Sequence, residues 1–287
     1  MEKSKKSLGQ NFLLNKEKIK EIVGALDIKS GDTVIEIGPG HGELTKEIKN
    51  QISNIKIIAI EKDERLAEEL KNEMGIYGDR IEIIAGDALE VITKLKIKNY
   101  KIMGNIPYYI TGFLLRTISG LKNKPSVTVL TVQKEVAERI CGGIYPVRNL
   151  ARAARAPEGS ARRVISNGMN LLAASVRYWA EPEIIGIIPK SDFSPQPKVD
   201  SAIIRLKTID RKQEIGSEVK DSENYYKFIK ILFKQPRKTI LNNLFKTGKN
   251  KKEIEKVLKE NGVNPNDRAQ NLEVADIKKI SNIIGNS

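Results

Sequence analysis

The sequence predicts an α/β fold, in which a doubly wound sheet of seven strands is followed by a small all-helical domain. Short runs rich in β-branched residues alternate with longer amphipathic stretches between residues 33 and 206, which is the pattern of a largely parallel sheet with helices on both faces. Beyond residue 206 only helical spacing remains. A length of 287 residues is enough for one domain of ordinary size and one small domain.

Seven short runs are expected to form the strands of this sheet. They cover residues 33–37, 56–60, 81–85, 101–104, 127–132, 184–188 and 202–206. Apolar residues at helical spacing predict connecting helices at residues 43–49, 64–74, 112–118 and 134–141. We expect the last two strands to form an antiparallel hairpin at the edge of the sheet.

The C-terminal region begins with a polar stretch from residue 207 to about residue 222. We therefore predict a first domain of residues 1–206 and a helical domain of residues 207–287. One helix is expected around Gln235-Pro236, because proline suits the first turn of a helix, and two more around residues 254–258 and 274–284. Residues 207–287 hold 18 Lys and Arg against 11 Asp and Glu, which predicts a basic surface there.

Charge and cysteine content narrow the class of partner and the compartment. The chain has 50 Lys and Arg against 36 Asp and Glu, a formal net charge of +14, which favours a nucleic-acid partner. Cys141 is the only cysteine, which excludes an intramolecular disulfide and a zinc site of paired cysteines. No apolar run approaches the roughly 18 residues of a membrane span, so we expect a cytoplasmic protein that acts without a membrane.

A glycine-rich loop after the first expected strand is a candidate binding site. The sequence EIGPGHGEL places Gly38, Gly40 and Gly42 at the mouth of a helix, where glycine lets the chain turn sharply and a ligand approach the backbone. Glu61 ends the second strand, where its carboxylate suits two ribose hydroxyls, and Asp87 ends the third, where it suits the exocyclic amine of an adenine. A glycine turn that binds nothing is the alternative for the loop alone, but two acids at successive strand ends favour a nucleoside site.

The spacing of this loop leaves open which nucleoside cofactor binds. A dinucleotide site also combines a glycine loop with an acid, but this loop lacks the GxGxxG spacing, Pro39 stiffens it, and Glu36 would repel phosphates. A cofactor with a ribose, an adenine and a positive centre but no phosphate fits better, and S-adenosylmethionine is that molecule. No metal is expected, because His41 is the only histidine and has no partner for a metal site or a catalytic triad.

The segment GNIPYYIT, residues 104–111, carries the most specific chemical signal in the chain. An Asn, an apolar residue, Pro and an aromatic residue form the arrangement needed to methylate the exocyclic amine of a base. The side-chain oxygen of Asn105 and the backbone carbonyl of Ile106 can accept the amine's hydrogens and make its nitrogen more nucleophilic, with Pro107 fixing their divergence. Tyr108 is expected to stack on the base. The alternative is a tight turn with a buried tyrosine, which the position after the fourth strand disfavours.

A second aromatic side chain lies in SDFSPQPKVDS, residues 191–201. Pro195 and Pro197 predict an extended, stiff loop before the last strand. Phe193 is expected to clamp the opposite face of a base that has been taken out of its stack. Packing of Phe193 beneath the loop is the alternative, and the sequence favours neither.

Segments spread over nearly the whole chain resemble one family, the ribosomal RNA adenine dimethyltransferases, specifically the small-subunit type. The segments are KKSLGQNFL (5–13), EIGPGHGELT (36–45), IEKD (60–63), GDAL (86–89), GNIPYYIT (104–111), VQKEVAERI (132–140), PKVDSAIIRL (197–206) and QPRKTILNNL (235–244). The resemblance implies a class I methyltransferase fold and S-adenosylmethionine as the methyl donor. It also implies N6,N6-dimethylation of two adjacent adenosines in the 3′-terminal hairpin of small-subunit (16S) rRNA within a pre-ribosomal particle. We expect a monomer.

The resemblance also assigns roles to individual residues. By the family pattern, the residues that line the cofactor are Asn11, Leu13, Gly38, Glu61, Asp87 and Asn105. Residues 105–108 present the target base, and Phe193 helps to hold it. Composition alone would make the QNFL segment only part of a basic N-terminal arm.

Two other functions fit part of the sequence. Large-subunit rRNA adenine methyltransferases of the macrolide-resistance type share the GQNFL and NxPY motifs, but QPRKTILNNL in a longer basic helical domain and VQKEVAERI favour the small-subunit type. A non-catalytic rRNA-binding relative would keep the fold and lose methyl transfer. The intact Glu61, Asp87 and Asn105 argue against that alternative.

Residues 142–168 depart from the resemblance. In the family a short loop follows the VAERI helix, whereas here 27 residues lie between Cys141 and Met169, and about twenty of them are extra. The segment contains five Arg, one Glu and no Lys, while the rest of the chain has 36 Lys and nine Arg. We interpret it as a tolerated insertion of separate origin, with an acquired RNA-contacting arm as the alternative. We expect it to be mobile or to form one short helix around residues 150–156.

Overall fold

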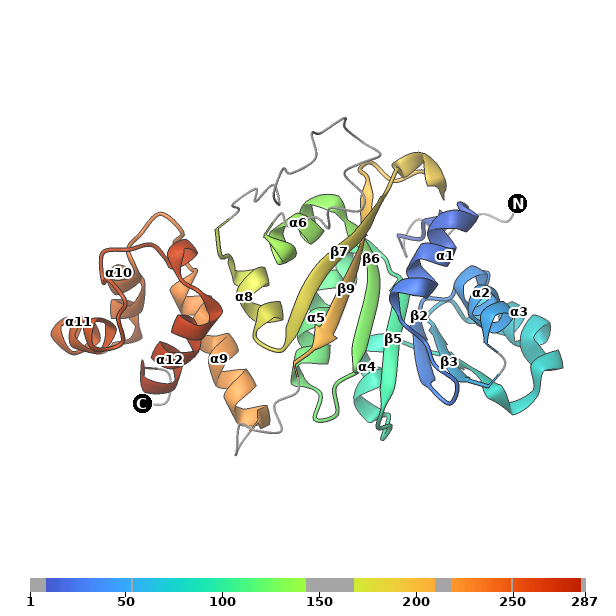
Figure 1. Ribbon diagram of the computed structural model, residues 1–287, viewed down its shortest axis with the longest axis horizontal. Helices are drawn as coiled ribbons and strands as arrows, with labels where there is room; N and C mark the ends of the chain where they lie inside the picture. Colours follow the sequence, from blue (N-terminus) through green and yellow to red (C-terminus); the bar gives the residue numbers. More distant parts are fainter. Residues whose placement is uncertain (1–8, 53, 143–167, 210–217, 249, 285–287) are drawn as a thin grey trace, which may run out of the picture.

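A seven-stranded sheet forms the centre of the larger part of the molecule (Figure 1). This computed structural model describes residues 9–52, 54–142, 168–209, 218–248 and 250–284. The sheet order is β4-β3-β2-β5-β6-β9-β7. Its strands are β2 (Thr33–Ile37), β3 (Lys56–Glu61), β4 (Ile81–Ala85), β5 (Tyr100–Asn105), β6 (Val127–Gln133), β7 (Ala180–Ile188) and β9 (Ser201–Thr208). Each overlaps one of the seven predicted strands, which are therefore confirmed.

The parallel part of the sheet creates the position for a ligand. Strands β2 to β6 run parallel, with β3 on one side of β2 and β5 on the other. The strand order therefore changes direction at β2, and a crevice opens at the carboxyl ends of β2 and β5, where open α/β sheets bind ligands. Most residues of β2, β3, β5 and β6 are buried, which explains why these strands are rich in apolar and β-branched residues.

The other end of the sheet is antiparallel. Strand β9 pairs antiparallel with both β6 and β7, and β7 forms the edge. The predicted antiparallel hairpin at the edge is therefore confirmed. The register of β7 shifts between Ile184 and Gly186, which marks a β-bulge.

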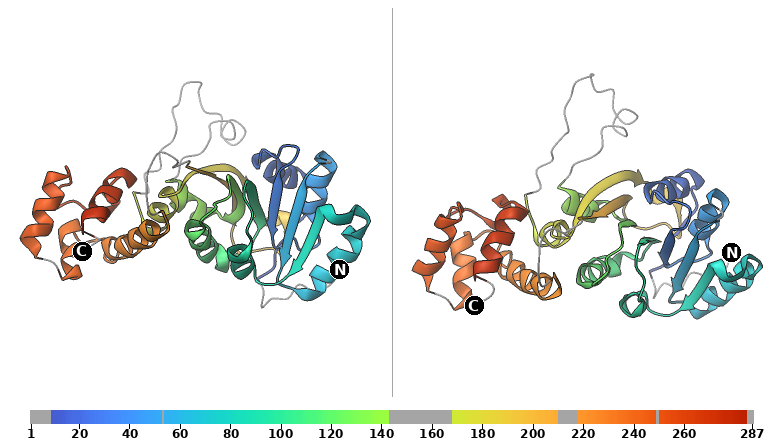
Figure 2. Two further views of the ribbon diagram at one scale, coloured as in Figure 1. Left: turned by 90° about the horizontal axis from the view of Figure 1, so that it is seen from below. Right: turned by 60° about the horizontal axis from the view of Figure 1, so that its bottom comes forward.

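Helices cover both faces of the sheet (Figures 1 and 2). On one face, α1 (Lys16–Ala25) and α2 (Glu43–Gln51) share a hydrophobic cluster with the sheet, and α3 (Glu64–Met74) is joined to α2 by the Lys46–Glu73 ion pair at 2.7 Å. On the other face lie α4 (Ala88–Lys94), α5 (Thr111–Gly120), α6 (Lys134–Cys141) and α8 (Leu171–Arg177). The predicted helices α2, α3, α5 and α6 are confirmed, whereas α1 and α4 were missed. No helix in the described ranges is both long and apolar enough to cross a bilayer.

A small second sheet holds the N-terminal segment in place. It consists of β1 (Phe12–Leu13) and β8 (Phe193–Ser194), which pair antiparallel. Next to this pair, the N–H of Leu14 donates to the carbonyl of Asp192 at 2.8 Å, and Nδ2 of Asn15 donates to the Asp192 carboxylate at 2.9 Å. The oxygen of the same Asn15 side chain caps α1. The sequence did not predict this sheet, because strands of two residues have no readable periodicity.

Four helices make up the described C-terminal region: α9 (Glu218–Leu232), α10 (Ile240–Leu244), α11 (Lys251–Glu260) and α12 (Val274–Ile284). The predicted helices at residues 254–258 and 274–284 are confirmed. The buried residues of the four helices join those of α5 and α8 in one hydrophobic cluster. Tyr225 of α9 stacks on Tyr178 with ring centroids 4.0 Å apart, and its hydroxyl donates to the carbonyl of Ala174 at 3.2 Å. The division into two domains at residues 206 and 207 stays a prediction.

The predicted helix start at Pro236 was wrong. Helix α9 ends at Leu232 and α10 begins at Ile240, so Pro236 lies in the turn between them. In this turn the N–H of Lys238 donates to the carbonyl of Gln235 at 3.0 Å. The fixed φ of proline suits the second position of a β-turn as well as the first turn of a helix, so the sequence pattern does not separate the two.

Residues 143–167, which include most of the predicted insertion and its expected short helix, lie outside the described residues. The residues that flank them are joined to each other. Asn170, which caps α8, donates to the carbonyl of Arg139 in α6 at 2.8 Å, and Nε of Arg177 in α8 donates to the carbonyl of Ile140 at 3.2 Å. Gly142 caps the C-terminus of α6 in a left-handed conformation. The chain therefore leaves α6 and returns to α8 at neighbouring points.

Candidate active site

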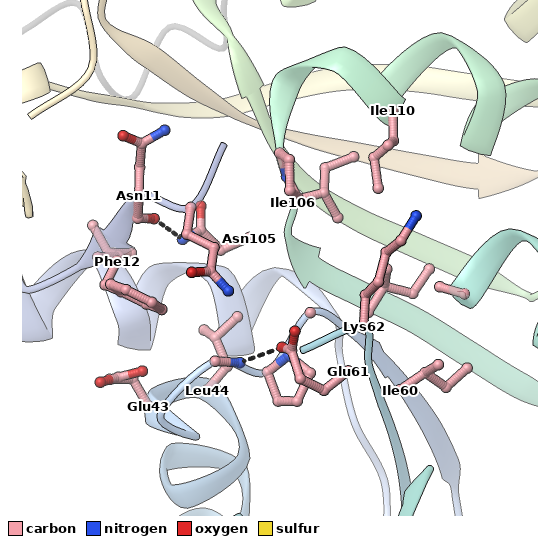
Figure 3. A pocket seen from close by; sticks show the side chains of 18 of the residues that line it. Asn11, Phe12, Glu43, Leu44, Ile60, Glu61, Lys62, Asn105, Ile106 and Ile110 are labelled. Carbon is pink, nitrogen blue, oxygen red and sulfur yellow. Dashed lines mark hydrogen bonds between the residues drawn. The ribbon is translucent and has the colours of Figure 1, made fainter. Parts of the chain in front are cut away.

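A pocket opens at the carboxyl ends of β2, β3, β4 and β5, and the N-terminal segment forms its other side (Figure 3). Every predicted site residue except Phe193 lines it. The lining residues are Gln10, Asn11, Phe12, Leu13, Ile19, Ile37, Gly38, Pro39, Gly40, Glu43, Leu44, Ile60, Glu61, Lys62, Gly86, Asp87, Ala88, Asn105, Ile106, Pro107, Tyr108, Tyr109 and Ile110.

The loop between β2 and α2 forms one wall of this pocket. Gly38, Gly40 and Gly42 have φ angles of 66°, 60° and 81°, a left-handed conformation that residues with a side chain rarely adopt. Gly38 and Gly40 line the pocket, whereas Gly42 packs against Leu70 of α3. The N–H of Gly40 donates to Oε2 of Glu61 at 3.0 Å, which ties the loop to the end of β3 (Figure 3).

Glu61 ends β3 with a buried carboxylate. Its Oε2 accepts from Gly40, and its Oε1 accepts from the N–H of Asp63 at 2.9 Å. Burial raises the pKa of this carboxyl, while the backbone hydrogen bonds act in the opposite direction. Each carboxylate oxygen has a further lone pair, so both can still accept from a diol. Binding of a ribose by Glu61 stays a prediction that this position allows.

Asp87 begins α4 and pairs with Lys62. Its Oδ1 accepts from the N–H of Leu89 at 2.9 Å, and its Oδ2 lies 2.8 Å from Nζ of Lys62. The hydrogen bond from Lys62 lowers the pKa of Asp87, which keeps the carboxylate ionised and able to accept from a ligand amine. Lys62 itself lines the pocket (Figure 3). Sequence reasoning missed Lys62, because a lysine after a strand reads as an ordinary surface charge.

Glu36 does not contribute to the pocket surface. Its side chain is fully buried in β2, and its Oε2 accepts from the hydroxyl of Thr45 in α2 at 2.6 Å. Burial raises the pKa of Glu36 to about 8. Its Oε1 has no hydrogen-bond partner among the described residues. The argument that Glu36 repels phosphates was therefore wrong, because its carboxyl is directed to α2 and not to a ligand.

The N-terminal segment forms the wall opposite the strand ends. Asn11, Phe12 and Leu13 line the pocket there. The ring of Phe12 packs on the ring of His41, with centroids 4.6 Å apart, so His41 supports the glycine loop by packing. The carbonyl of Asn11 accepts from Nδ2 of Asn105 at 2.8 Å (Figure 3). The residues alone indicated only a basic arm here, and the resemblance was needed to place this segment at the site.

Asn105 ends β5 with its side-chain amide in a defined orientation. Because Nδ2 donates to the Asn11 carbonyl, Oδ1 is the atom of this amide that can accept a hydrogen bond from a ligand. Gly104 precedes it, and a Cβ at Gly104 would lie 2.5 Å from the carbonyl oxygen of Ile37. Only glycine therefore lets β5 approach the end of β2 closely enough to bring Asn105 into the pocket.

The turn after Asn105 places the remaining residues of the motif. Ile106 and Pro107 line the pocket, and the carbonyl of Pro107 accepts from the N–H of Ile110 at 3.1 Å, which closes a tight turn. The hydroxyl of Tyr108 lies 2.6 Å from Oγ of Ser201 at the start of β9. Burial raises the pKa of Tyr108. Its ring is only partly buried and is held at the pocket by this contact, as a stacking role requires.

Phe193 is the one predicted site residue outside the pocket. It is 4% exposed and belongs to the hydrophobic cluster that contains Leu13 and Ile19. In β8 it lies opposite Leu13 of β1. The packing alternative describes its position, and contact of Phe193 with a substrate base stays a prediction that requires the ring to become uncovered.

The charge of the lining selects among ligands. Three carboxylates, Glu43, Glu61 and Asp87, face one ammonium group, that of Lys62. This excess of negative charge favours a ligand with a positive centre and disfavours one with phosphates. Within the described ranges, no group of three or more His, Cys, Asp or Glu side chains is arranged to hold a metal ion.

Comparison with known proteins decides the family. The sequence model of the family described as ribosomal RNA adenine dimethylase matches residues 1–148 and 156–286. The chain belongs to this ribosomal RNA adenine dimethylase family. The interruption of the match falls inside residues 142–168, the segment that departs from the resemblance.

Relatives in the dimethylase family cover nearly the whole chain. A ribosomal RNA small subunit methyltransferase A from Geobacillus thermodenitrificans is 34% identical over 292 residues, which cover 98% of this chain and 90% of the relative. The protein of the same name from Mycoplasma capricolum is 34% identical over 289 residues and covers 98% of each chain. The chain is therefore a member of an rRNA adenine dimethyltransferase family, as the resemblance implied.

Solved structures of methyltransferases share its architecture. A dimethyladenosine transferase from Plasmodium falciparum has a TM-score of 0.70 and 26% identity, covering 94% of this chain and 95% of that one. The 23S rRNA methyltransferase ErmE has a TM-score of 0.66 at 21% identity, covering 96% of this chain and 99% of that one, which shows a common fold. The class I methyltransferase fold is therefore confirmed for this member of the dimethylase family.

Proposed function

We propose that this protein transfers methyl groups from S-adenosylmethionine to N6 of two adjacent adenosines in the 3′-terminal hairpin of small-subunit (16S) rRNA. The observation that carries the proposal is the orientation of Asn105, whose Nδ2 is held by the Asn11 carbonyl so that Oδ1 is presented as an acceptor. Membership in the adenine dimethylase family and relatives named small-subunit methyltransferases support the choice of substrate.

The residues of the pocket fit S-adenosylmethionine by the chemistry of their donors and acceptors. Glu61 would accept from the ribose hydroxyls, and Asp87 would accept from the adenine amine. The left-handed loop at Gly38 and Gly40 brings backbone rather than side chains to the ligand. The surplus of carboxylates over Lys62 suits a cation without phosphates. The cofactor would supply a methyl group bonded to a sulfonium sulfur, which makes its carbon electrophilic.

The residues 105–108 would act on the target amine. The lone pair of an adenine amine is delocalised into the ring, so the nitrogen is a weak nucleophile. Oδ1 of Asn105 and the carbonyl of Ile106 would accept its two hydrogens and shift the nitrogen toward a tetrahedral form. Tyr108, fixed through its hydroxyl at Ser201, would stack on the base and hold the amine in line. The nitrogen loses its proton to solvent after the methyl group has arrived, so no strong general base is needed.

The expected partner is a small-subunit pre-ribosomal particle in the cytoplasm, with the enzyme acting as a monomer. The basic surface of the C-terminal helices supports an RNA partner: Arg237 and Lys238 are exposed in the turn before α10. Their position beyond α9 would let them contact RNA outside the pocket. A contact of this kind is electrostatic and independent of sequence.

The proposal is tested by methyl transfer to small-subunit particles that lack the modification. Purified protein is incubated with methyl-labelled S-adenosylmethionine, and primer extension across the 3′ hairpin locates the product. We expect two adjacent stops and four methyl groups per particle, with no label in Asn105→Ala. Label in large-subunit RNA alone would assign the protein to the large-subunit type. Cofactor binding without transfer to either RNA would make it a non-catalytic relative.

A further inference from the structure

Two exposed aromatic side chains lie beside the pocket, one in the 3-10 turn Tyr108–Ile110 and one in α5, which follows it directly. Tyr109 is 54% exposed and lines the pocket rim, and Phe113 is 66% exposed one helical turn later. The inward face of α5 is buried through Thr111, Leu114, Leu115 and Ile118. Tyr109 and Phe113 therefore do not belong to the core, although the chain is only 5% aromatic and buries most of its large apolar side chains.

A cation follows the two aromatic rings along the same surface. Arg116 is exposed, and its guanidinium carbon lies 3.7 Å from the ring centroid of Tyr226 in α9. Lys230, one turn further along α9, has its Nζ 6.0 Å from the same centroid. Figure 1 shows α9 on the C-terminal side of α5 and α8. We name Tyr109, Phe113, Arg116 and Tyr226 the α5 stripe. It begins at the pocket and ends at the basic helical region.

The surrounding sequence has one sign of charge. Residues 91–134, which contain α5 and the strands on either side of it, include no Asp or Glu. They include eight basic residues, of which Lys94, Lys96, Lys98, Arg116, Lys122 and Lys134 are exposed, whereas Lys101 is buried and paired with Asp32 at 2.8 Å. On α9, Glu223 is paired with Lys227 at 3.0 Å, and Lys230 is exposed beside the stripe. Arg116 of the stripe and the neighbouring exposed Lys230 therefore give this surface a charge that is complementary to a polyanion.

Aromatic rings between cations are the surface on which single-stranded nucleic acid stacks. Each base offers a flat face to a ring, while Arg and Lys contact the phosphates between the bases. Phe113 lies four residues after Tyr109, in the first turn of the α-helix that follows the 3-10 turn Tyr108–Ile110. Tyr109 is both exposed and part of the pocket lining, so a strand that leaves the pocket over Tyr109 would bring its next base toward Phe113.

We propose that the α5 stripe binds the RNA strand next to the target adenosine, with the adjacent base stacked on Phe113 and the following phosphate at Arg116. This inference rests on the proposed function for the identity of the RNA. It adds the path of the substrate outside the pocket. Phe113 is a substrate-binding residue here, because it holds the neighbouring nucleotide and does not touch the reacting amine.

The test replaces Phe113 and measures RNA binding apart from catalysis. Phe113→Ala and Phe113→Leu remove the ring, and Phe113→Trp keeps a stacking surface. Phe245→Ala is the matched control, because Phe245 is also an exposed phenylalanine (51%) and lies in the 3-10 turn Phe245–Thr247, outside the stripe. Binding is measured by fluorescence anisotropy with the 3′ hairpin and with an oligoadenylate. A second hairpin carries 2-aminopurine next to the target adenosine to report stacking.

We expect Phe113→Ala and Phe113→Leu to weaken the binding of both RNAs by about tenfold, the typical effect of losing one stacked base. The change in 2-aminopurine fluorescence on binding should be lost in these variants and kept in Phe113→Trp and Phe245→Ala. Calorimetry should give unchanged cofactor affinity in all four. Arg116→Gln should lower the dependence of binding on salt.

Three results would overturn the inference. RNA affinity and 2-aminopurine signal equal to wild type in Phe113→Ala would remove the base from this surface. An equal loss of RNA affinity in Phe245→Ala would show that the α5 stripe has no specific role in RNA binding. Unchanged RNA binding with lost activity only on assembled particles would assign Phe113 to a protein contact. Wild-type protein that binds RNA through Phe113 but methylates no small-subunit hairpin would contradict the proposed function and leave the stripe intact.

Discussion

Replacing Gly40 by alanine tests whether the glycine loop and the N-terminal segment are packed as one unit. Gly40 has a φ of 60°, and a Cβ there would lie 2.9 Å from Cε1 and 3.1 Å from Cδ1 of Phe12. The left-handed conformation costs an alanine roughly 1–2 kcal/mol. Forcing the methyl group against the ring costs about 1–3 kcal/mol more. We therefore expect Gly40→Ala to lower the free energy of unfolding by about 2–5 kcal/mol.

Gly38→Ala is the matched control for this change. Its φ is 66°, but the nearest atom to a Cβ there is the carbonyl oxygen of Asn105 at 4.0 Å, so only the backbone cost of roughly 1–2 kcal/mol is expected. Urea unfolding without cofactor, followed by circular dichroism, measures both. In a cycle with Phe12→Ala, Gly40→Ala should show a coupling of about 1–3 kcal/mol. Equal losses in Gly38→Ala and Gly40→Ala, or no coupling, would refute the packing of Phe12 on the loop.

Four other outcomes are expected. Asn105→Ala should remove methyl transfer in the labelled-cofactor assay. Its cofactor affinity, measured by calorimetry, should stay within a few-fold of wild type, because the amide acts mainly on the target amine. Methyl transfer at the wild-type rate would contradict this mechanism. Burial raises the pKa of Glu36 from 4.5 to about 8, so the unfolded chain releases a proton near pH 4.5 that the folded protein keeps until about pH 8. The free energy of unfolding should therefore fall as the pH rises over this range in the wild type, and fall less in Glu36→Gln. Urea unfolding at a series of pH values measures this change, and an equal fall in both proteins would contradict the prediction. Neutralising Arg237 and Lys238 should lower the slope of log affinity against log salt by about 1 for each lost phosphate contact, and a salt-independent wild type would remove the basic region from the RNA. Deleting residues 144–167 should leave the fold and cofactor binding intact, and a large loss of methylation of the assembled particle alone would make the segment a substrate arm.

The sheet could be predicted because of how its strands are buried. Strands such as β3 and β6 are covered by helices on both faces, so their sequences are runs of apolar and β-branched residues that stand out between amphipathic helices. Helix α1 also had a readable signal, since Asn15 caps it and Ile19, Ile22 and Val23 share one face, but this signal was missed. Strands β1 and β8 could not be found, because pairing of two residues depends on parts of the chain that are far apart in sequence.

The part of the site that could be predicted consists of polar side chains at the ends of strands. Glu61, Asp87 and Asn105 end or follow neighbouring strands, and the carboxyl ends of parallel strands must meet at one edge. The role of Lys62 could be recognised only in the structure, because it depends on the ion pair with Asp87 at 2.8 Å. Phe193 could not be settled for the same reason, since its burial follows from the pairing of β8 with β1.

The hydrogen bonds between α6 and α8 are consistent with the interpretation of residues 142–168 as a tolerated insertion. Asn170 and Arg177 donate to the carbonyls of Arg139 and Ile140, so the two ends of the connection are held together by contacts between α6 and α8. Lengthening a loop whose ends are already fixed costs only about 0.6 kcal/mol for each doubling. The same junction is therefore a suitable site for engineering, where a fluorescent reporter could replace residues 144–167 and report binding of the proposed rRNA substrate.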